Sequence, residues 1–169
     1  LNLDDDGNGN GSNRTTFQLL PFNFIFYGIS YNEITISADG WISFDRHDIP
    51  SFRNHPIPGA GGPSPMVAAF WDDLKTGSGG DVFYQQFPLG CSHDCDYVVI
   101  QWDDMRTFYN NSRETFEIIL YNNEDEPTLT GDNEIKIQYS DFNNTSSGSY
   151  PVAGTPTHGC YATIGIENH

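Results

Sequence analysis

The stretch PFNFIFYGISYNEITISADGWISF, residues 21–44, decides the fold. Its aromatic residues recur at every second position: Phe22, Phe24 and Phe26. Period-two alternation rich in aromatic and β-branched residues indicates a half-buried strand. Further along, Asp39 and Gly40 separate two such runs, and glycine accepts the positive φ that a tight turn requires. We therefore expect a β-hairpin in which residues 33–37 and 40–45 are antiparallel neighbours.

Runs of the same kind recur along the rest of the chain. They occupy residues 15–20, 66–74, 81–86, 98–102, 115–121, 134–139 and 161–167. No window shows a sustained helical period, and the segments between the runs are rich in Gly, Pro and Asn. The pattern predicts an all-β protein built as a two-sheet antiparallel sandwich. Residues 15–169 form its single domain, and residues 1–14 are an acidic segment rich in Gly and Asn.

Several motifs resemble one extracellular family. In chain order they are FIFYGISY (24–31), DGWISF (39–44), AFWDDL (69–74), DVFYQQ (81–86), YVVIQW (97–102), TFEIILY (115–121), EIKIQY (134–139) and ATIGIEN (162–168). This order resembles the nidogen-type (NIDO-like) module found in bacterial secreted proteases and surface proteins. The resemblance implies a β-sandwich, a location outside the cell or on its surface, and no catalytic residues.

The charge of the chain excludes some partners. The formal net charge is −16, with only seven Lys and Arg residues. Nucleic acids and anionic membrane surfaces need clustered cations, so we expect neither as a partner. No apolar run is long enough to span a bilayer, which argues against membrane insertion. The first residue is Leu1 and no signal peptide precedes it, so we expect a mature or excised fragment.

The N-terminal segment contains a candidate calcium loop. Asp4, Asp6 and Asn8 alternate as in an Asp-x-Asp-x-Asn-Gly loop, whose carboxylate and amide oxygens converge on one Ca²⁺. The twelfth position is Thr15 and not a bidentate Glu, so the full EF-hand pattern is absent. Flexible linkers have the same composition. Both interpretations stay open from the sequence.

Two Trp-Asp-Asp triplets form a second candidate calcium site. If their strands lie side by side, the carboxylates of Asp72, Asp73, Asp103 and Asp104 gather at one end of the sandwich. Such a group repels itself unless a cation or a proton intervenes, and Ca²⁺ prefers oxygen ligands. Alternatively, each Asp caps a turn or faces water. A glycosidase would also use paired carboxylates, although no other feature of the sequence supports that activity.

Three cysteines leave the pairing open. Cys91 and Cys95 are four residues apart, and Cys160 is distant. In an oxidising compartment we expect a Cys91–Cys95 disulfide, with Cys160 left as a thiol that can form an interchain bond. A bond from Cys160 to one of the other two cysteines is the second possibility. A zinc site with His93 or His158 is the third.

These observations favour a non-catalytic extracellular module that binds or adheres to a protein or a glycan, stabilised by calcium. No Gly-x-Ser-x-Gly elbow is present, and no catalytic triad stands out. The alternative function is a structural subunit of a surface layer or filament that self-associates through its sheet edges. The proline-rich stretch 45–65 is either a binding loop or a cover over one sheet edge.

Overall fold

The computed structural model describes residues 1, 3, 14–48, 51–59, 61–77, 79–93, 95–125, 127–146 and 161–168. All regular structure in these residues is β. The strands are β1 (Thr15–Phe26), β2 (Ile29–Ser37), β3 (Trp41–Ser43), β4 (Met66–Trp71), β5 (Leu74–Lys75), β6 (Asp81–Phe87), β7 (Tyr97–Thr107), β8 (Arg113–Tyr121), β9 (Ile135–Asp141) and β10 (Thr163–Glu167). No helix in the described ranges could cross a membrane. The all-β prediction is confirmed.

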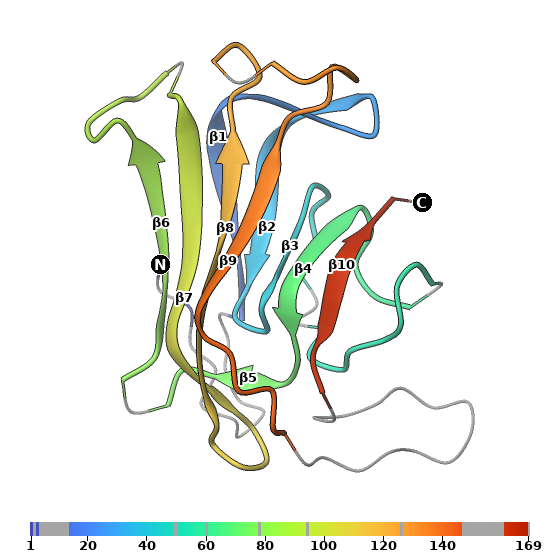
Figure 1. Cartoon of the computed structure of the whole chain (residues 1–169), viewed down its shortest axis with the longest axis vertical. Helices are drawn as coiled ribbons and strands as arrows, with labels where there is room; N and C mark the ends of the chain where they lie inside the picture. Colours follow the sequence, from blue (N-terminus) through green and yellow to red (C-terminus); the bar gives the residue numbers. More distant parts are fainter. Residues whose placement is uncertain are drawn as a thin grey trace.

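The strands form two antiparallel sheets that pack face to face (Figure 1). The first sheet has the order β1-β2-β3-β4-β10. The second has the order β5-β7-β8-β9, and β6 also pairs with β7. In Figure 1 the long strands of the second sheet stand on the left, and β4 and β10 extend to the right beyond β9. The predicted two-sheet sandwich is therefore present.

The predicted hairpin joins β2 to β3. Its register pairs Thr35 with Ser43 and Ile36 with Ile42. Gly40 has φ of 80°, and its carbonyl accepts hydrogen bonds from two backbone N–H groups of β4, each at 3.1 Å. A Cβ at Gly40 would lie 2.0 Å from the Phe70 carbonyl oxygen. The turn thus needs glycine for its φ and for its close contact with β4.

The core lies between the inner faces of the two sheets. Its largest fully buried members are Phe24, Ile34, Ile36, Ile42, Phe70, Leu74, Ile100, Trp102 and Phe116. Trp102 of the second sheet stacks on Phe116 at 5.1 Å between ring centroids. Its indole N–H also donates to the Ser37 carbonyl of the first sheet, at 2.8 Å. A buried tryptophan therefore supplies both apolar area and a hydrogen bond that joins the sheets.

A second, smaller core lies on the outer face of the first sheet. Trp41, Met66, Ala68 and Trp71 are fully buried there, with Ile57 packed against them. Ser51 accepts a 2.6 Å hydrogen bond from the Trp71 indole N–H, and a Cβ at Gly62 would lie 2.5 Å from the Trp71 ring. The proline-rich stretch therefore covers this face. The sequence left open a binding loop or a cover over one sheet edge, and in the described ranges the stretch instead covers the outer face of the first sheet.

Candidate functional site

The outer face of the second sheet retains solvent exposure in the described part of the chain. Along β8, Arg113, Thr115 and Glu117 point outward, whereas the residues between them are buried. The cross-strand register then aligns Phe83, Gln101, Glu117 and Gln138 in one row across β6, β7, β8 and β9. Alternation along each strand and pairing between strands together place these side chains on one surface.

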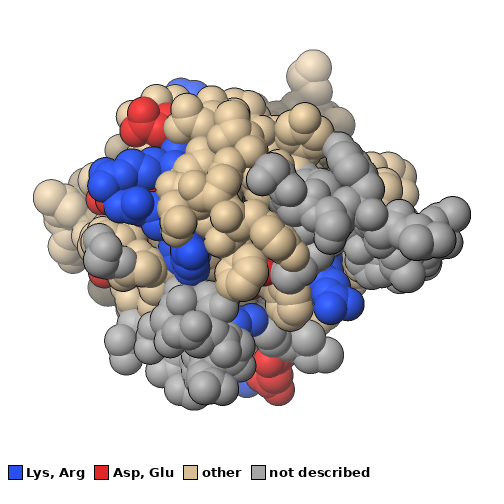
Figure 2. Space-filling model, turned by 90° about the horizontal axis from the view of Figure 1, so that it is seen from below, with Lys and Arg blue, Asp and Glu red and all other residues tan. Residues whose placement is uncertain are grey.

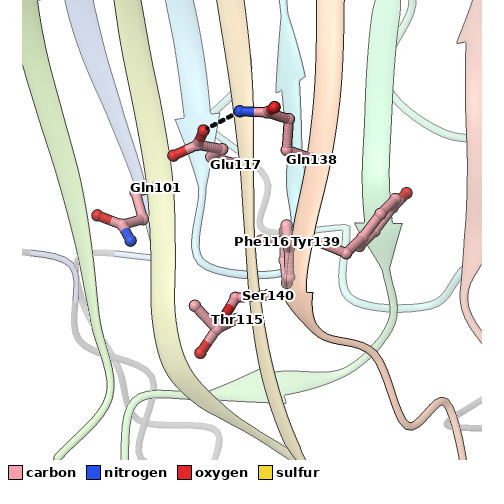
Figure 3. A pocket seen from close by; sticks show the side chains of 7 residues that line it. All are labelled: Gln101, Thr115, Phe116, Glu117, Gln138, Tyr139 and Ser140. Carbon is pink, nitrogen blue, oxygen red and sulfur yellow. Dashed lines mark hydrogen bonds between the residues drawn. The ribbon is translucent and has the colours of Figure 1, made fainter.

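A hollow of about 400 Å³ lies on this face, lined by Gln101, Thr115, Phe116, Glu117, Gln138, Tyr139 and Ser140 (Figure 3). Two of its side chains are fixed by a hydrogen bond, because Gln138 Nε2 donates to Glu117 Oε1 at 2.6 Å. Tyr139 belongs to the other side of β9, since its hydroxyl donates to the Ala69 carbonyl of the first sheet at 2.7 Å. The hollow thus offers amide, hydroxyl and carboxylate groups held on a paired β-ladder.

Aromatic rings border the polar row. Phe83, at the β6 end of the row, is 44 % exposed. Farther along the same face, Phe87 stacks on Tyr97 at 4.9 Å, and Tyr97 lies 5.6 Å from Tyr121. Sequence reasoning missed this surface, although the signal was present. The positions that alternate with the buried residues carry Gln101, Glu117, Gln138 and aromatic side chains, together with charged residues such as Arg113 and Lys136.

The four aspartates of the two triplets do not meet as predicted. That prediction required β4 and β7 to be neighbours, but these strands belong to different sheets. Asp103 and Asp104 also lie within β7 and not at its end. At these two residues a bulge interrupts the register, between Trp102 and Met105. The apolar run thus continues past the doubled acid because a bulge absorbs the extra residue.

The two acidic pairs have opposite environments. Asp104 has φ of 48° and is ion-paired with Arg113 at 3.0 Å, whereas Asp103 is exposed. Asp72 and Asp73 are buried where the chain crosses from the first sheet to the second. Burial raises the pKa of Asp72 to about 7, and hydrogen bonds from the Asp73 backbone and the Ser146 hydroxyl oppose that rise.

A further buried carboxylate, Glu114, escaped sequence analysis. It lies on the inner face of β8, and its negative charge also raises the pKa of Asp72. Ser112 Oγ donates to it at 2.8 Å, and the backbone N–H groups of Asn143 and Asn144 donate at 2.7 and 3.1 Å. These bonds tie the segment after β9 to β8. The sequence held a signal for Glu114, because it alternates with Phe116 and Ile118 and therefore occupies an inward position of the strand.

The remaining site predictions have different outcomes. Asp4, Asp6, Asn8, His158 and Cys160 lie outside the described residues. Cys91 and Cys95 are joined by a disulfide with sulfur atoms 2.04 Å apart, which agrees with the expected pairing. No group of three or more His, Cys, Asp or Glu in the described ranges is arranged to hold a metal ion. Calcium binding stays a prediction.

Comparison with known proteins identifies the family. A search of the curated proteins and a search of the solved structures each gave no match. The sequence model of the "NIDO related" family matches residues 5–169, nearly the whole chain. Domains of this family are typically non-catalytic, and such a domain with a disulfide is consistent with an extracellular location. The chain therefore belongs to the NIDO-related family.

Proposed function

We propose that this domain is a non-catalytic extracellular binding module whose ligand is carbohydrate, bound on the outer face of the second sheet. The observation that carries the proposal is the row Gln101–Glu117–Gln138 in the hollow. Amide side chains donate and accept hydrogen bonds, and a carboxylate accepts them. Sugar hydroxyl groups do both, so they complement this row.

The hollow suits a polar ligand better than an apolar one. Its volume of about 400 Å³ is in the range of small-molecule sites, yet Gln101, Glu117 and Gln138 line it where such sites are usually apolar. Burying these side chains under a lipid would leave their polar atoms without hydrogen bonds. The exposed ring of Phe83 at the edge adds a flat apolar surface for the C–H face of a sugar.

The strand order favours a glycan over an extended peptide. Peptides that add to a sheet bind through the backbone of an edge strand. The hollow is lined from β7, β8 and the end strand β9, and of these strands β7 and β8 are each paired on both sides. Their backbone groups are already used in the ladder, so recognition here depends on side chains. Because a hydrogen bond already orders the side chains of Glu117 and Gln138, these two residues lose little conformational entropy on binding.

The test is affinity electrophoresis in native gels that contain a soluble polysaccharide, with dextran, galactan and polygalacturonate as separate probes. We expect at least one probe to retard the wild-type protein, and Glu117→Ala and Gln138→Ala to remove the retardation. Gln85→Ala, an exposed change on the same face outside the hollow, is the matched control. Unretarded wild-type protein with all probes, or retardation that survives both hollow variants, would overturn the proposal.

A further inference from the structure

The strand register places three cations next to one another on the face that bears the hollow. Lys75 of β5 pairs with Arg106 of β7, and Arg106 pairs with Arg113 of β8. We call these three residues the cation row. Like charges directly opposite in a sheet are destabilising. The whole chain has only seven Lys and Arg residues, so a row of three is a large share of them in one place.

Among the described residues, Asp104 is the carboxylate that forms ion pairs with the cation row. Asp104 Oδ1 lies 3.0 Å from Arg113 Nη1, and its Oδ2 lies 3.8 Å from Arg106 Nη2. Lys75 Nζ donates to the Phe108 carbonyl at 3.2 Å and lies 5.4 Å from the centre of the Phe108 ring. Asp104 is one negative charge beside the three positive charges of the row, and Asp81, Asp103 and Asp141 lie in the next row on the same face. The row therefore has positive charge to offer to an anionic ligand.

Within the cation row, Arg113 is the side chain that is most open to a ligand. The Arg113 side chain is 61 % exposed, and that of Arg106 is 20 % exposed. Figure 2, which views the molecule from below, shows Lys and Arg side chains gathered on this end. A guanidinium presents two parallel N–H donors that match a carboxylate or a sulfate ester. Binding of such a group would use the N–H donors that Asp104 leaves unused.

The row continues into the hollow along β8. Arg113, Thr115 and Glu117 are successive outward residues, so Arg113 lies about 7 Å from Thr115 and about 13 Å from Glu117 between Cα atoms. A hydrogen bond joins the two parts, because the Asp104 backbone N–H donates to Thr115 Oγ1 at 3.1 Å. A ligand of a few sugar rings would therefore span both.

The charges on this face also set the direction of the ligand. Glu117, Asp103, Asp81 and Asp141 are negative and lie on the side of the hollow, where Lys136 is also exposed, whereas the cation row lies toward β5. At physiological ionic strength charges are screened over about 8 Å, so the distant acids of this −16 chain act weakly on the row. Asp81, Asp103 and Asp141 lie between the cation row and the hollow on the same face, so a ligand avoids repulsion only where its negative group sits at the cation row and its uncharged hydroxyl groups lie over these carboxylates and Glu117.

From these contacts we infer that the ligand is an acidic glycan, whose negative group binds the cation row while its sugar rings occupy the hollow. This inference rests on the proposed carbohydrate binding and adds the ligand class. The negative group is a carboxylate, as in a uronic acid, or a sulfate ester. Both offer the oxygen atoms that an arginine fork binds.

Isothermal titration calorimetry with matched neutral and acidic probes tests the inference. The pairs are galactotetraose with tetragalacturonic acid, for the carboxylate, and dextran with dextran sulfate, for the sulfate ester. We expect one acidic probe to bind about tenfold more tightly than its neutral partner, as for hydrogen bonds to charged groups. Arg113→Gln should remove this preference without changing the affinity for the neutral probe, and added salt should weaken only the acidic probe.

Arg46→Gln is the control, because it removes the same charge from an exposed ion pair with Glu33 on the first sheet. Lys75→Gln is a second row variant, and thermal unfolding checks that each variant is folded. If neutral and acidic probes bind equally and Arg113→Gln has no effect, the inference fails while the proposed function stands. If no probe binds, both fail. Polyglutamate that binds as tightly as the acidic sugars would overturn the glycan part of the inference.

Discussion

The outer faces of the two sheets differ in what covers them. On the first sheet, Trp41 and Trp71 are fully buried beneath the proline-rich stretch. On the second sheet, Gln101, Glu117 and Gln138 line a hollow. Both faces follow from the same period-two alternation, so the difference lies in the residue types at the outward positions. Apolar outward residues require a cover, whereas polar ones can face solvent and bind a ligand.

The largest test of this comparison removes the covered tryptophan. Trp71→Ala should lower the free energy of unfolding by about 3–5 kcal/mol, because it leaves a cavity between β4 and the proline-rich stretch. Urea unfolding followed by far-ultraviolet circular dichroism measures the change. Phe83→Ala, on the open face, should stay within about 0.5 kcal/mol of the wild type. If the two variants lost equal free energy of unfolding, the outer face of the first sheet would not be the more deeply packed of the two.

A second test concerns the crossing between the sheets, where Asp72 is buried with a pKa raised to about 7. The unfolded chain has the ordinary value of about 3.8, so the folded state binds the extra proton between these values. The contribution of Asp72 to stability should therefore be full below about pH 3.8, fall by a few kcal/mol as the pH rises toward 7, and change little above it.

Asp72→Asn removes this titration. The variant should show a flatter stability profile between pH 4 and 7 and exceed the wild type in stability at pH 8, because it buries no charge there. Urea unfolding at a series of pH values measures both. Asp103→Asn, an exposed change, is the control. A variant whose profile parallels that of the wild type would assign the pH dependence to other groups.

A third test separates binding from stability on the open face. The double variant Glu117→Ala, Gln138→Ala loses one hydrogen bond of 2.6 Å on a part-exposed surface. We expect its free energy of unfolding to fall by about 1 kcal/mol or less, whereas retardation by polysaccharide is lost. Thermal unfolding and affinity electrophoresis of the same sample give both values. If the free energy of unfolding fell as much as in Trp71→Ala, Glu117 and Gln138 would have a structural role and not a binding role.

The smallest expected effect is that of calcium. Asp104 already pairs with Arg113, and Asp72, Asp73, Asp103 and Asp104 do not belong to any group in the described ranges that could hold a metal ion, so the calcium prediction rests on Asp4, Asp6 and Asn8. At a calcium concentration equal to a dissociation constant of about 1 mM, stabilisation would be only about 0.4 kcal/mol. Thermal unfolding with calcium or chelator measures it. The double variant Asp4→Asn, Asp6→Asn should abolish the effect of calcium on the unfolding temperature. If the effect persists, calcium binds at other residues.

The strands were predictable because the alternation is a local property. The phase of Phe22, Phe24 and Phe26 agrees with their burial, and the Asp-Gly turn lies between paired strands as expected. The end of β7 was not predictable from local pattern. A bulge at Asp104 lets the strand continue. Asp104 is ion-paired with Arg113, which belongs to a different strand, β8, and so lies outside any local window.

The candidate site was predictable only in part. Outward residues of each strand could be read from the sequence, but not which of them share a row. Gln101, Glu117 and Gln138 are separated by at least sixteen residues each, and only the register of β7, β8 and β9 aligns them. The pairs Asp72–Asp73 and Asp103–Asp104 show the opposite case. Their similar sequences suggested that they lie close together, but β4, which precedes the first pair, and β7, which contains the second, belong to different sheets.

The sequence by itself determined the all-β class, the hairpin, the buried phases of the strands and the family, since these depend on short-range pattern and motif order. The tertiary structure decided which strands are neighbours, which outer face is covered, and that Lys75, Arg106 and Arg113 stand in one row. The physical reason is that strand pairing is a long-range choice. It depends on how whole sheets bury their apolar faces against each other, and no local window contains that information.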